Sequence, residues 1–428
     1  MTTGPDALAQ EDEKPAWKTQ DEQTQTRLRS PQFDEDERLK IGLQAVGGLQ
    51  LLTHSNDPGS LPDIEGGFQS AAGNLTFDAR VTDGIDVYAE LYLSSPNHTG
   101  DVYDREGYIY VDYLPEFFGS LNGIFEHVDL KAGHMELNFG DEHFYRSDVA
   151  QVMKNPLFGN YIIDANTIGV GVELYGFAGP LTAMVGYNSG ATTADFTDGH
   201  RNAILGKLAL GRLDSPYRLS GSFYTVDQSR NGPGFPFGGS SSNLFSGNFS
   251  GSRYSAVWEG SPNAGQLTIG GGQDVTAFQL DGRAKPIEGL TVSGLFGWFQ
   301  DDDTNGFFLN PEVGRNGDDG NPTAEWTYYG GTVQYYIADP FYVAFRYNAA
   351  SANTLGTPTN EDRSAEGIVQ RIQAGFGLWV VPDRLAFKAE YVNQWASDFQ
   401  PGAKRLRGLD LATDPKFYGV AAEVAVNF

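Results

Sequence analysis

The chain has 428 residues, no cysteine, 54 glycines and a formal net charge of −26 from 29 basic and 55 acidic residues. The absence of cysteine excludes a disulfide scaffold and thiol chemistry, and the acidic balance argues against nucleic acid as a partner, because phosphates need a basic surface. No apolar run approaches the ~18 residues of a transmembrane helix, whereas 28 Phe and 21 Tyr favour β-strands.

Residues 1–37 are charged and rich in Pro and Gln, and they lack a periodic apolar pattern. Such a segment cannot bury enough surface to fold alone, so we expect a flexible N-terminal arm ahead of one folded unit, residues 38–428. Ala7-Leu8-Ala9 before Gln10 matches the small-residue cleavage site of an exported precursor. A chance match in an alanine-rich chain is the alternative.

A strict alternation of apolar and polar residues begins after this arm. Leu75 and Phe77 alternate with polar residues such as Asp78, and an Asp83-Gly84 turn leads into a second alternating run, 85–93. Because side chains in a strand alternate between two faces, this pattern predicts a β-hairpin. Both strands have about the 9–11 residues needed to cross a bilayer.

The same pattern recurs along the chain and segregates by loop length. Further strands are predicted at 181–187, 218–225, 274–284, 290–299, 326–337, 341–347, 368–380 and 385–391, with Pro residues in the short turns rather than in the strands. Long connections are predicted at 138–165, 228–250, 300–324, 351–365 and 396–415. Short turns at one end and long loops at the other are typical of a transmembrane antiparallel β-barrel, with short periplasmic turns and long external loops.

The last residues of the chain show the pattern most clearly. Tyr418, Val420, Val424 and Phe428 fall on one apolar face, and Glu423 falls on the other, polar or small face. This predicts a strand with its outside in lipid and its inside in water. Counting strands gives about 18, with 16 as the alternative, because 266–272 is a weak strand; either barrel is too wide to be filled by side chains.

The polar faces of the strands predict a wetted inner wall, because a charge facing lipid costs about 2–4 kcal/mol near the bilayer midplane. Two interpretations stay open: charges that pair with neighbours across strands, or a transverse field across a channel constriction. The expected wall residues are Asp78, Arg80, Glu90, Arg346, Arg371, Lys388 and Glu390.

The connection 138–165 is unusual because it combines many charges with apolar residues such as Phe139 and Phe158. An exposed loop avoids such residues, whereas a loop packed inside a barrel uses them. Its candidate site residues are Asp141, Glu142, His143, Arg146, Asp148, Lys154 and Asp164.

The alternation, the terminal Phe428 and this loop together resemble the porin superfamily over residues 38–428. The phrases Phe-Gly-Asp-x-His-Phe-x-Arg-Ser-Asp and Asn-Pro-x-x-x-Asn-Tyr-Ile-x-Asp are most similar to the phosphate-selective group, broadly defined. The resemblance implies an outer-membrane homotrimer embedded in lipid, with the loop folded inward to form the pore constriction. Members that select phosphate have basic linings, whereas this chain is acidic overall, so cation and anion preference both stay open.

One segment matches a calcium-binding pattern. The oxygen-ligand spacing of a Ca²⁺ loop, with glycine at the sharp bend, is matched by Asp301, Asp303, Asn305, Gly306 and Glu312. The preceding strand and Pro311 argue against the flanking helices of an EF-hand, so this is a candidate Ca²⁺ loop or a chance match in an acidic external loop.

The sequence therefore predicts a non-enzymatic outer-membrane porin through which small hydrophilic solutes or ions diffuse. A structural tether that uses the N-terminal arm is one alternative, and a soluble β-rich secreted protein is another. A third alternative is an outer-membrane barrel hydrolase, for which His143 beside Asp141 and Asp148 is the candidate.

Overall fold

The computed structural model describes residues 37–55, 66–69, 71–94, 102–146, 152–163, 165, 168–188, 203–213, 215–227, 244, 254, 274–301, 323–356, 367–399, 405–406, 409–410 and 414–428. The expected N-terminal arm and the weak strand at 266–272 lie outside these residues. Within the described ranges, no helix has the length and apolar character to cross a bilayer.

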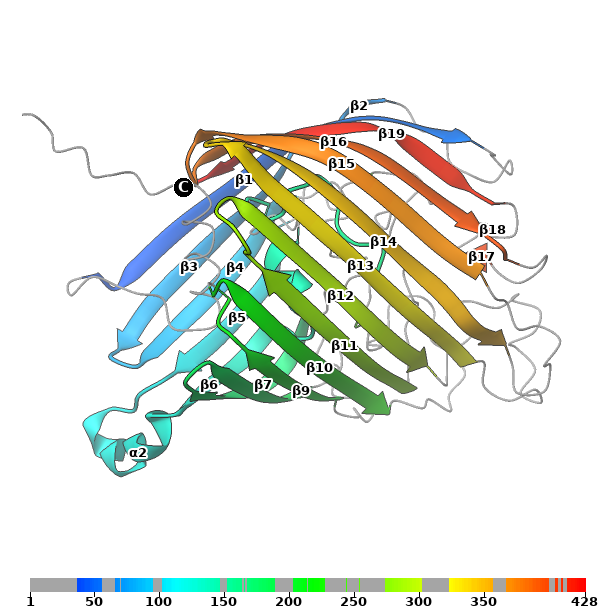
Figure 1. The fold of residues 1–428 in the computed structure, drawn as a ribbon. Helices are drawn as coiled ribbons and strands as arrows, with labels where there is room; N and C mark the ends of the chain where they lie inside the picture. Colours follow the sequence, from blue (N-terminus) through cyan, green and yellow to red (C-terminus); the bar gives the residue numbers. More distant parts are fainter. Residues whose placement is uncertain are drawn as a thin grey trace, which may run out of the picture.

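The described chain is almost entirely antiparallel β-sheet (Figure 1). Its long strands are β1 Leu39–Ser55, β3 Ala72–Thr82, β4 Ile85–Ser94, β5 Tyr103–Val111, β6 Val128–Glu136, β7 Ile168–Ala178, β8 Leu181–Asn188, β9 Ala203–Leu210, β10 Tyr217–Asp227, β11 Asp274–Ala284, β12 Leu290–Asp301, β13 Thr323–Ala338, β14 Phe341–Gly356, β15 Gly367–Val381, β16 Leu385–Ser397 and β19 Lys416–Asn427. Three two-residue strands complete the set: β2 Gly67–Phe68, which pairs with β1, and the separate pair β17 Arg405–Leu406 and β18 Leu409–Asp410.

The sheet closes on itself. β1 pairs with β3 on one side and with β19 on the other, from Gln44 opposite Asn427 to Ser55 opposite Lys416. Among the described residues, this gives a closed barrel of 16 long strands plus the short β2, the smaller of the two strand counts predicted from the sequence. Closure pairs backbone groups that an open edge would leave bare, which a strand in lipid cannot tolerate.

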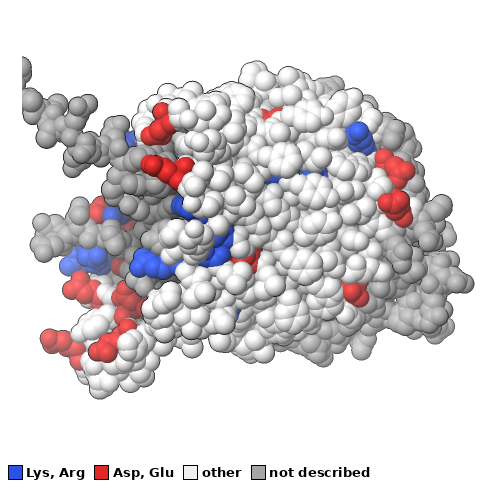
Figure 2. Space-filling model, in the orientation of Figure 1, with Lys and Arg blue, Asp and Glu red and all other residues white. Residues whose placement is uncertain are grey.

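The outer surface is apolar where the strands cross the barrel. On β9, Ile204 and Leu208 point outward with 50% and 55% of their surface exposed, whereas Lys207 between them points inward and is 7% exposed. On β19, Val424 is exposed and Glu423 is buried, as the alternation predicts. Charged side chains gather mainly toward the two ends of the visible face and leave a broad uncharged surface between them (Figure 2). The barrel therefore has an outer surface suited to lipid.

The two ends of the barrel differ in their connections. One end has tight turns such as 83–84, 179–180 and 339–340, and the other end has the longer connections. The exception at the tight-turn end is 112–127, which contains the 3₁₀ helix η1 Glu116–Leu121 and the short helix α2 Asn122–Phe125 and projects beyond the strands (Figure 1). Phe117 on this projection is 89% exposed.

Gly133 on β6 provides a test of the strand geometry. Its φ of 145° lies in a region that favours glycine, and a Cβ there would clash with the backbone oxygen of Gly107. We expect Gly133→Ala to lower the free energy of unfolding by about 1–3 kcal/mol, measured by urea titration of the detergent-solubilised barrel. Gly107→Ala, on the facing strand, has no atom within 4 Å of its added Cβ and is the matched control. Equal loss in both variants would contradict this account.

Candidate functional site

The connection between β6 and β7, residues 137–167, is here called the inner loop. Its described parts are a first segment, 137–146, and a return segment, 152–163, together with Ala165. Apart from the half-buried Tyr145, every described residue of these parts is buried. Phe139 and Phe158 are 1% and 0% exposed and join the main apolar cluster with wall residues such as Tyr224. The loop that leaves the barrel at the long-connection end thus packs back inside it.

The first segment is fixed to β9 and β10 through Asp141. The carboxylate lies 2.8 Å from Lys207 Nζ. Arg218 donates hydrogen bonds to both of its oxygens, from Nε at 2.6 Å and from Nη2 at 2.9 Å. Gly140 N donates to Ser222 Oγ at 3.0 Å. Burial alone would raise the pKa of Asp141, but Lys207 and Arg218 hold this pKa well below the usual range of a carboxyl group. Asp141 therefore stays ionised and acts as an anchor.

The return segment is fixed to β14, β15 and β16 by three cationic side chains. Each donates to backbone carbonyl oxygens of the loop: Arg346 to Gly159 at 2.8 Å, Arg371 to Asn160 at 2.6 Å, and Lys388 to Val152 and Asn155 at 2.7 and 3.0 Å. Lys388 Nζ also lies 2.5 Å from Glu423 on β19. These charges serve as hydrogen-bond donors to a backbone that has left regular structure.

Glu390 supplies the opposite kind of contact. Its Oε2 accepts hydrogen bonds from the backbone N–H groups of Phe158 and Gly159 at 2.9 and 3.2 Å. Its Oε1 accepts a short hydrogen bond from the hydroxyl of Tyr254, a buried residue of the connection between β10 and β11. The wall thus presents cations to the loop carbonyls and an anion to the loop amides.

A chain of alternating charges joins the start of the inner loop to its end. Arg105 Nη1 lies 3.2 Å from Glu90, Arg105 Nη2 lies 3.1 Å from Glu136, and Glu136 in turn lies 2.5 Å from Arg146. Arg146 also donates to the carbonyl of Ala165 at 3.2 Å, just before β7. Because the two segments attach to separate groups of strands, β6–β10 and β14–β16, the inner loop bridges the barrel interior.

The structure places most residues that the sequence analysis singled out. On the first segment, Glu142 and His143 lie within the short 3₁₀ helix η2 Glu142–Tyr145, and Asp141 and Arg146 flank it. Lys154 is buried on the return segment. The inward wall residues are where the alternation predicts them: Arg80 lies 4.0 Å from Asp86, Asp78 is opposite Lys40 on β1, and Glu90, Arg346, Arg371, Lys388 and Glu390 are buried. Asp148 and Asp164 lie outside the described residues.

The candidate Ca²⁺ loop also lies largely beyond the described part of the chain. Asp301 is the last residue of β12, whereas Asp303, Asn305 and Glu312 are not described. Within the described ranges, no group of three or more His, Asp or Glu side chains is placed to hold a metal ion.

Sequence reasoning missed Lys207, Arg218 and Arg105 as anchors. Lys207 lies among Leu205 and Ala209 on the same inward face, so the pattern on β9 gives no polar-face signal. Arg105 lies between two acidic neighbours, Asp104 and Glu106, and such a run of charges is typical of an exposed surface. Only the folded barrel brings Lys207 and Arg218 against Asp141 of the loop, and Arg105 against Glu90 and Glu136 on neighbouring strands.

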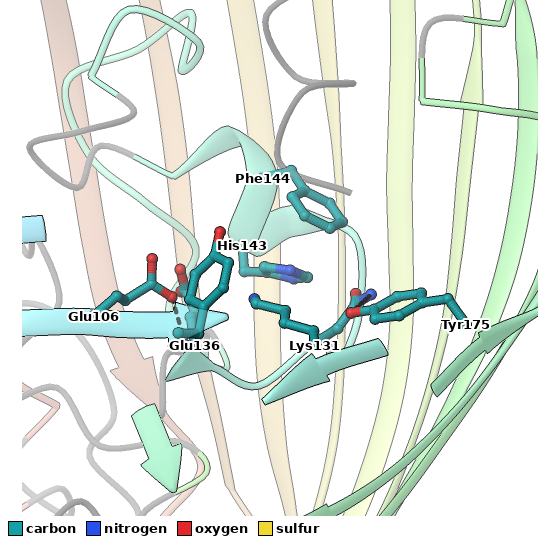
Figure 3. A pocket seen from close by; sticks show the side chains of 8 residues that line it. Glu106, Lys131, Glu136, His143, Phe144 and Tyr175 are labelled. Carbon is teal, nitrogen blue, oxygen red and sulfur yellow. Dashed lines mark hydrogen bonds between the residues drawn. The ribbon is translucent and has the colours of Figure 1, made fainter. Parts of the chain in front are cut away.

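A small cavity opens beside η2 against the inner faces of β5, β6 and β7 (Figure 3). Its volume is about 20 Å³, and Glu106, Lys131, Glu136, His143 and Tyr175 are among the residues that line it. His143 is 3% exposed and its ring lies against Phe144, with centroids 3.8 Å apart. Burial lowers the pKa of His143 to about 3, so the imidazole is neutral at neutral pH.

No protein-family model matches the chain, and no curated protein sequence does either. Solved structures match its fold. The outer membrane channel DcaP of Acinetobacter baumannii matches with a TM-score of 0.54 at 13% identity, over 93% of this chain and 100% of that one. OmpT, an outer membrane protein of Vibrio cholerae, gives 0.53 at 11% identity over 91% and 97% of the two chains. An anion-selective porin from Comamonas acidovorans gives 0.53 at 11% identity over 91% and 99%.

The fold is that of the outer-membrane porins. At such low identity the similarity concerns architecture alone, and at that level the predicted all-β transmembrane barrel is confirmed. A closed barrel with an apolar outer surface is also the architecture of bacterial outer-membrane proteins, in agreement with the predicted location.

The Asp141 anchor yields a prediction on stability. Asp141→Asn leaves Lys207 and Arg218 buried without their counter-charge, and we expect the free energy of unfolding to fall by about 3–5 kcal/mol. Urea titration in detergent measures the change, and Glu288→Gln, at an exposed turn, is the control that removes one carboxylate from the surface. If Asp141→Asn lowers the free energy of unfolding no more than the control does, the Asp141 anchor does not hold the loop.

The same anchor predicts the response to acid. A carboxyl group with a depressed folded-state pKa contributes stability above its unfolded pKa, about 3.9, and loses it as the pH falls through the folded value. Because the pKa of Asp141 lies well below the usual range, the difference in stability between wild type and Asp141→Asn should persist in mild acid. Unfolding curves of both proteins at neutral pH and near pH ~4 test this; a difference present at neutral pH that disappears near pH ~4 would contradict it.

Proposed function

We propose that the protein is an outer-membrane channel through which small hydrophilic solutes or ions diffuse passively. The observation that carries the proposal is the inner loop, which bridges a closed barrel of 16 long strands and is bonded to its inner wall on both sides. A barrel of this size is too wide to be filled by wall side chains, so a loop fixed inside it is suited to narrow a water-filled path. DcaP is an outer membrane channel and the Comamonas protein is an anion-selective porin, which supports the same class of function for this chain.

The proposal assigns the selectivity region to the first segment of the inner loop and the wall opposite. Asp141, Glu142, His143 and Arg146 are its candidates, with Asp148, Lys154 and Asp164 as further candidates from the sequence. Arg346, Arg371 and Lys388 bind loop carbonyls and are 1–2% exposed, so in this proposal they position the loop. Asp141 and Arg146 are likewise ion-paired and buried, so they act in the selectivity region by fixing the position of the first segment. This use of three wall cations speaks against a specific selectivity for phosphate of the kind that the sequence resemblance suggested.

We also propose that the protein forms a homotrimer, which the mass of the detergent-solubilised protein tests.

The hydrolase alternative depends on His143. Nδ1 of this residue has no hydrogen-bond partner among the described residues, and Asp148, the other carboxylate named for that alternative, lies outside them. The channel is therefore the function that the described geometry supports best, and the tether alternative rests on the arm, which lies outside the described residues.

Planar-bilayer recording tests the channel. Purified wild-type protein is expected to give stable, ohmic single-channel steps, and the reversal potential under a KCl gradient gives its ion preference. Well-inserted, correctly folded protein that produces no steps would overturn the proposal.

A substitution of Arg346, which binds the return segment, tests whether the inner loop bounds the conducting path. Arg346→Ala removes the hydrogen bonds to Gly159 and Asn155 and the contact of the guanidinium with the Tyr161 ring, 4.4 Å from its centroid. We expect larger or noisier conductance steps, because the return segment is held less firmly across the interior. Arg384→Ala, at an exposed turn of the barrel end, removes the same charge away from the loop and should conduct like wild type. Identical traces from both variants would show that the return segment does not bound the path.

A further inference from the structure

Two side chains in the cavity beside η2 have unused hydrogen-bonding capacity. Lys131 on β6 is 8% exposed, and its described contact is with the ring of Tyr108, 4.1 Å from Nζ to the centroid. No described carboxylate lies within ion-pair distance of its ammonium group. His143, from the inner loop, is 3% exposed, and its Nδ1 has no described hydrogen-bond partner. Figure 3 shows both side chains reaching into the same space.

Buried polar groups without partners are rare, because each one has given up its hydrogen bonds to water. A cation and an unpartnered imidazole together in one cavity therefore indicate a ligand site. Whether the unused groups donate or accept hydrogen bonds indicates the charge of the ligand.

The acidic residues of this cavity are already engaged. Glu136 lies 3.1 Å from Arg105 and 2.5 Å from Arg146. Glu106 accepts the backbone N–H of Glu136 at 2.5 Å and lies 3.7 Å from Arg105. The capacity that remains is the ammonium of Lys131 and Nδ1 of His143, which donates in the tautomer that carries its proton there. Donors favour an anion, whereas a cation would meet carboxylates that are already neutralised.

We propose that Lys131 and His143 form a binding site for a small monovalent anion, either a halide or the carboxylate group of an organic solute. The cavity volume of about 20 Å³ has room for one or two water-sized groups, so the site takes a single ion or one charged group of a larger molecule. The proposal deepens the proposed function, on which it rests, by giving the channel an anion-binding step beside the loop that narrows it.

The first experiment reads binding without requiring conduction. The unfolding temperature of the detergent-solubilised barrel is measured in rising potassium chloride and, separately, potassium acetate, with potassium methanesulfonate, which is neither a halide nor a carboxylate, at matched ionic strength as the reference. A ligand that binds only the folded state raises the unfolding temperature in a saturable way. Chloride alone giving this rise identifies a halide site, and acetate giving it identifies a carboxylate site.

Variants locate the effect. Lys131→Met keeps the length of the side chain and removes its charge, and we expect the anion dissociation constant to rise about tenfold, the change for one lost charge-assisted hydrogen bond. His143→Phe, which keeps a ring against Phe144, should raise it about fivefold. Lys40→Met is the control, because Lys40 pairs with Glu37 at the end of β1, at 3.2 Å, away from the cavity. Wild-type mobility of unheated samples on SDS gels confirms that each variant is folded.

Recordings in bilayers then separate this inference from the channel itself. Wild-type conductance should saturate with the anion that stabilises the barrel, and Lys131→Met should lose that saturation while still conducting. No saturable stabilisation of the wild type, or equal stabilisation of wild type and Lys131→Met, would overturn the anion site even if the protein conducts well. Saturable stabilisation that depends on Lys131 in a barrel that gives no steps would retain the site and overturn the channel.

Discussion

The structure depends on one constraint: a backbone that crosses lipid must satisfy its hydrogen bonds within the protein. Antiparallel strands meet this demand only if the sheet has no open edge, so β1 must pair with both β3 and β19. The same closure fixes which side chains face outward, because the period of two cannot slip without turning charged residues toward lipid. Closing 16 long strands leaves an interior too wide for their own side chains to fill. The inner loop occupies part of this interior.

A loop inside a barrel meets the same constraint again, since its irregular backbone has few partners of its own. The wall supplies them with charge: Arg346, Arg371 and Lys388 donate to carbonyls, and Glu390 accepts from amides. Charged partners give stronger hydrogen bonds than neutral ones, and they are specific, because each side chain matches one sign of backbone dipole. These wall side chains, which the sequence alone suggests as the lining of a channel, therefore hold the inner loop in place.

This arrangement changes how the net charge of −26 bears on function. Many buried cations are committed to loop carbonyls or to carboxylates such as Asp141 and Glu136, so overall charge says little about what a solute meets inside. What matters is which charge is left without a described counterpart. Lys131, whose described contact is the ring of Tyr108, is in that position, and the proposed anion site rests on it and on the neighbouring His143.

The sequence by itself determined the barrel, the inward and outward faces of its strands and the inward-packing character of the loop at 138–165. These follow from local rules, since alternation, turn residues and the mixture of apolar and charged residues are all visible within a few positions. The tertiary structure decided the pairing of Asp141 with Lys207 and Arg218, the salt-bridge chain through Arg105 and the isolation of Lys131. It also decided that Arg371 and Lys388 hold loop carbonyls. The partners in these contacts are separated by tens to hundreds of positions in the chain, and only closure of the barrel brings them within a few ångströms of one another.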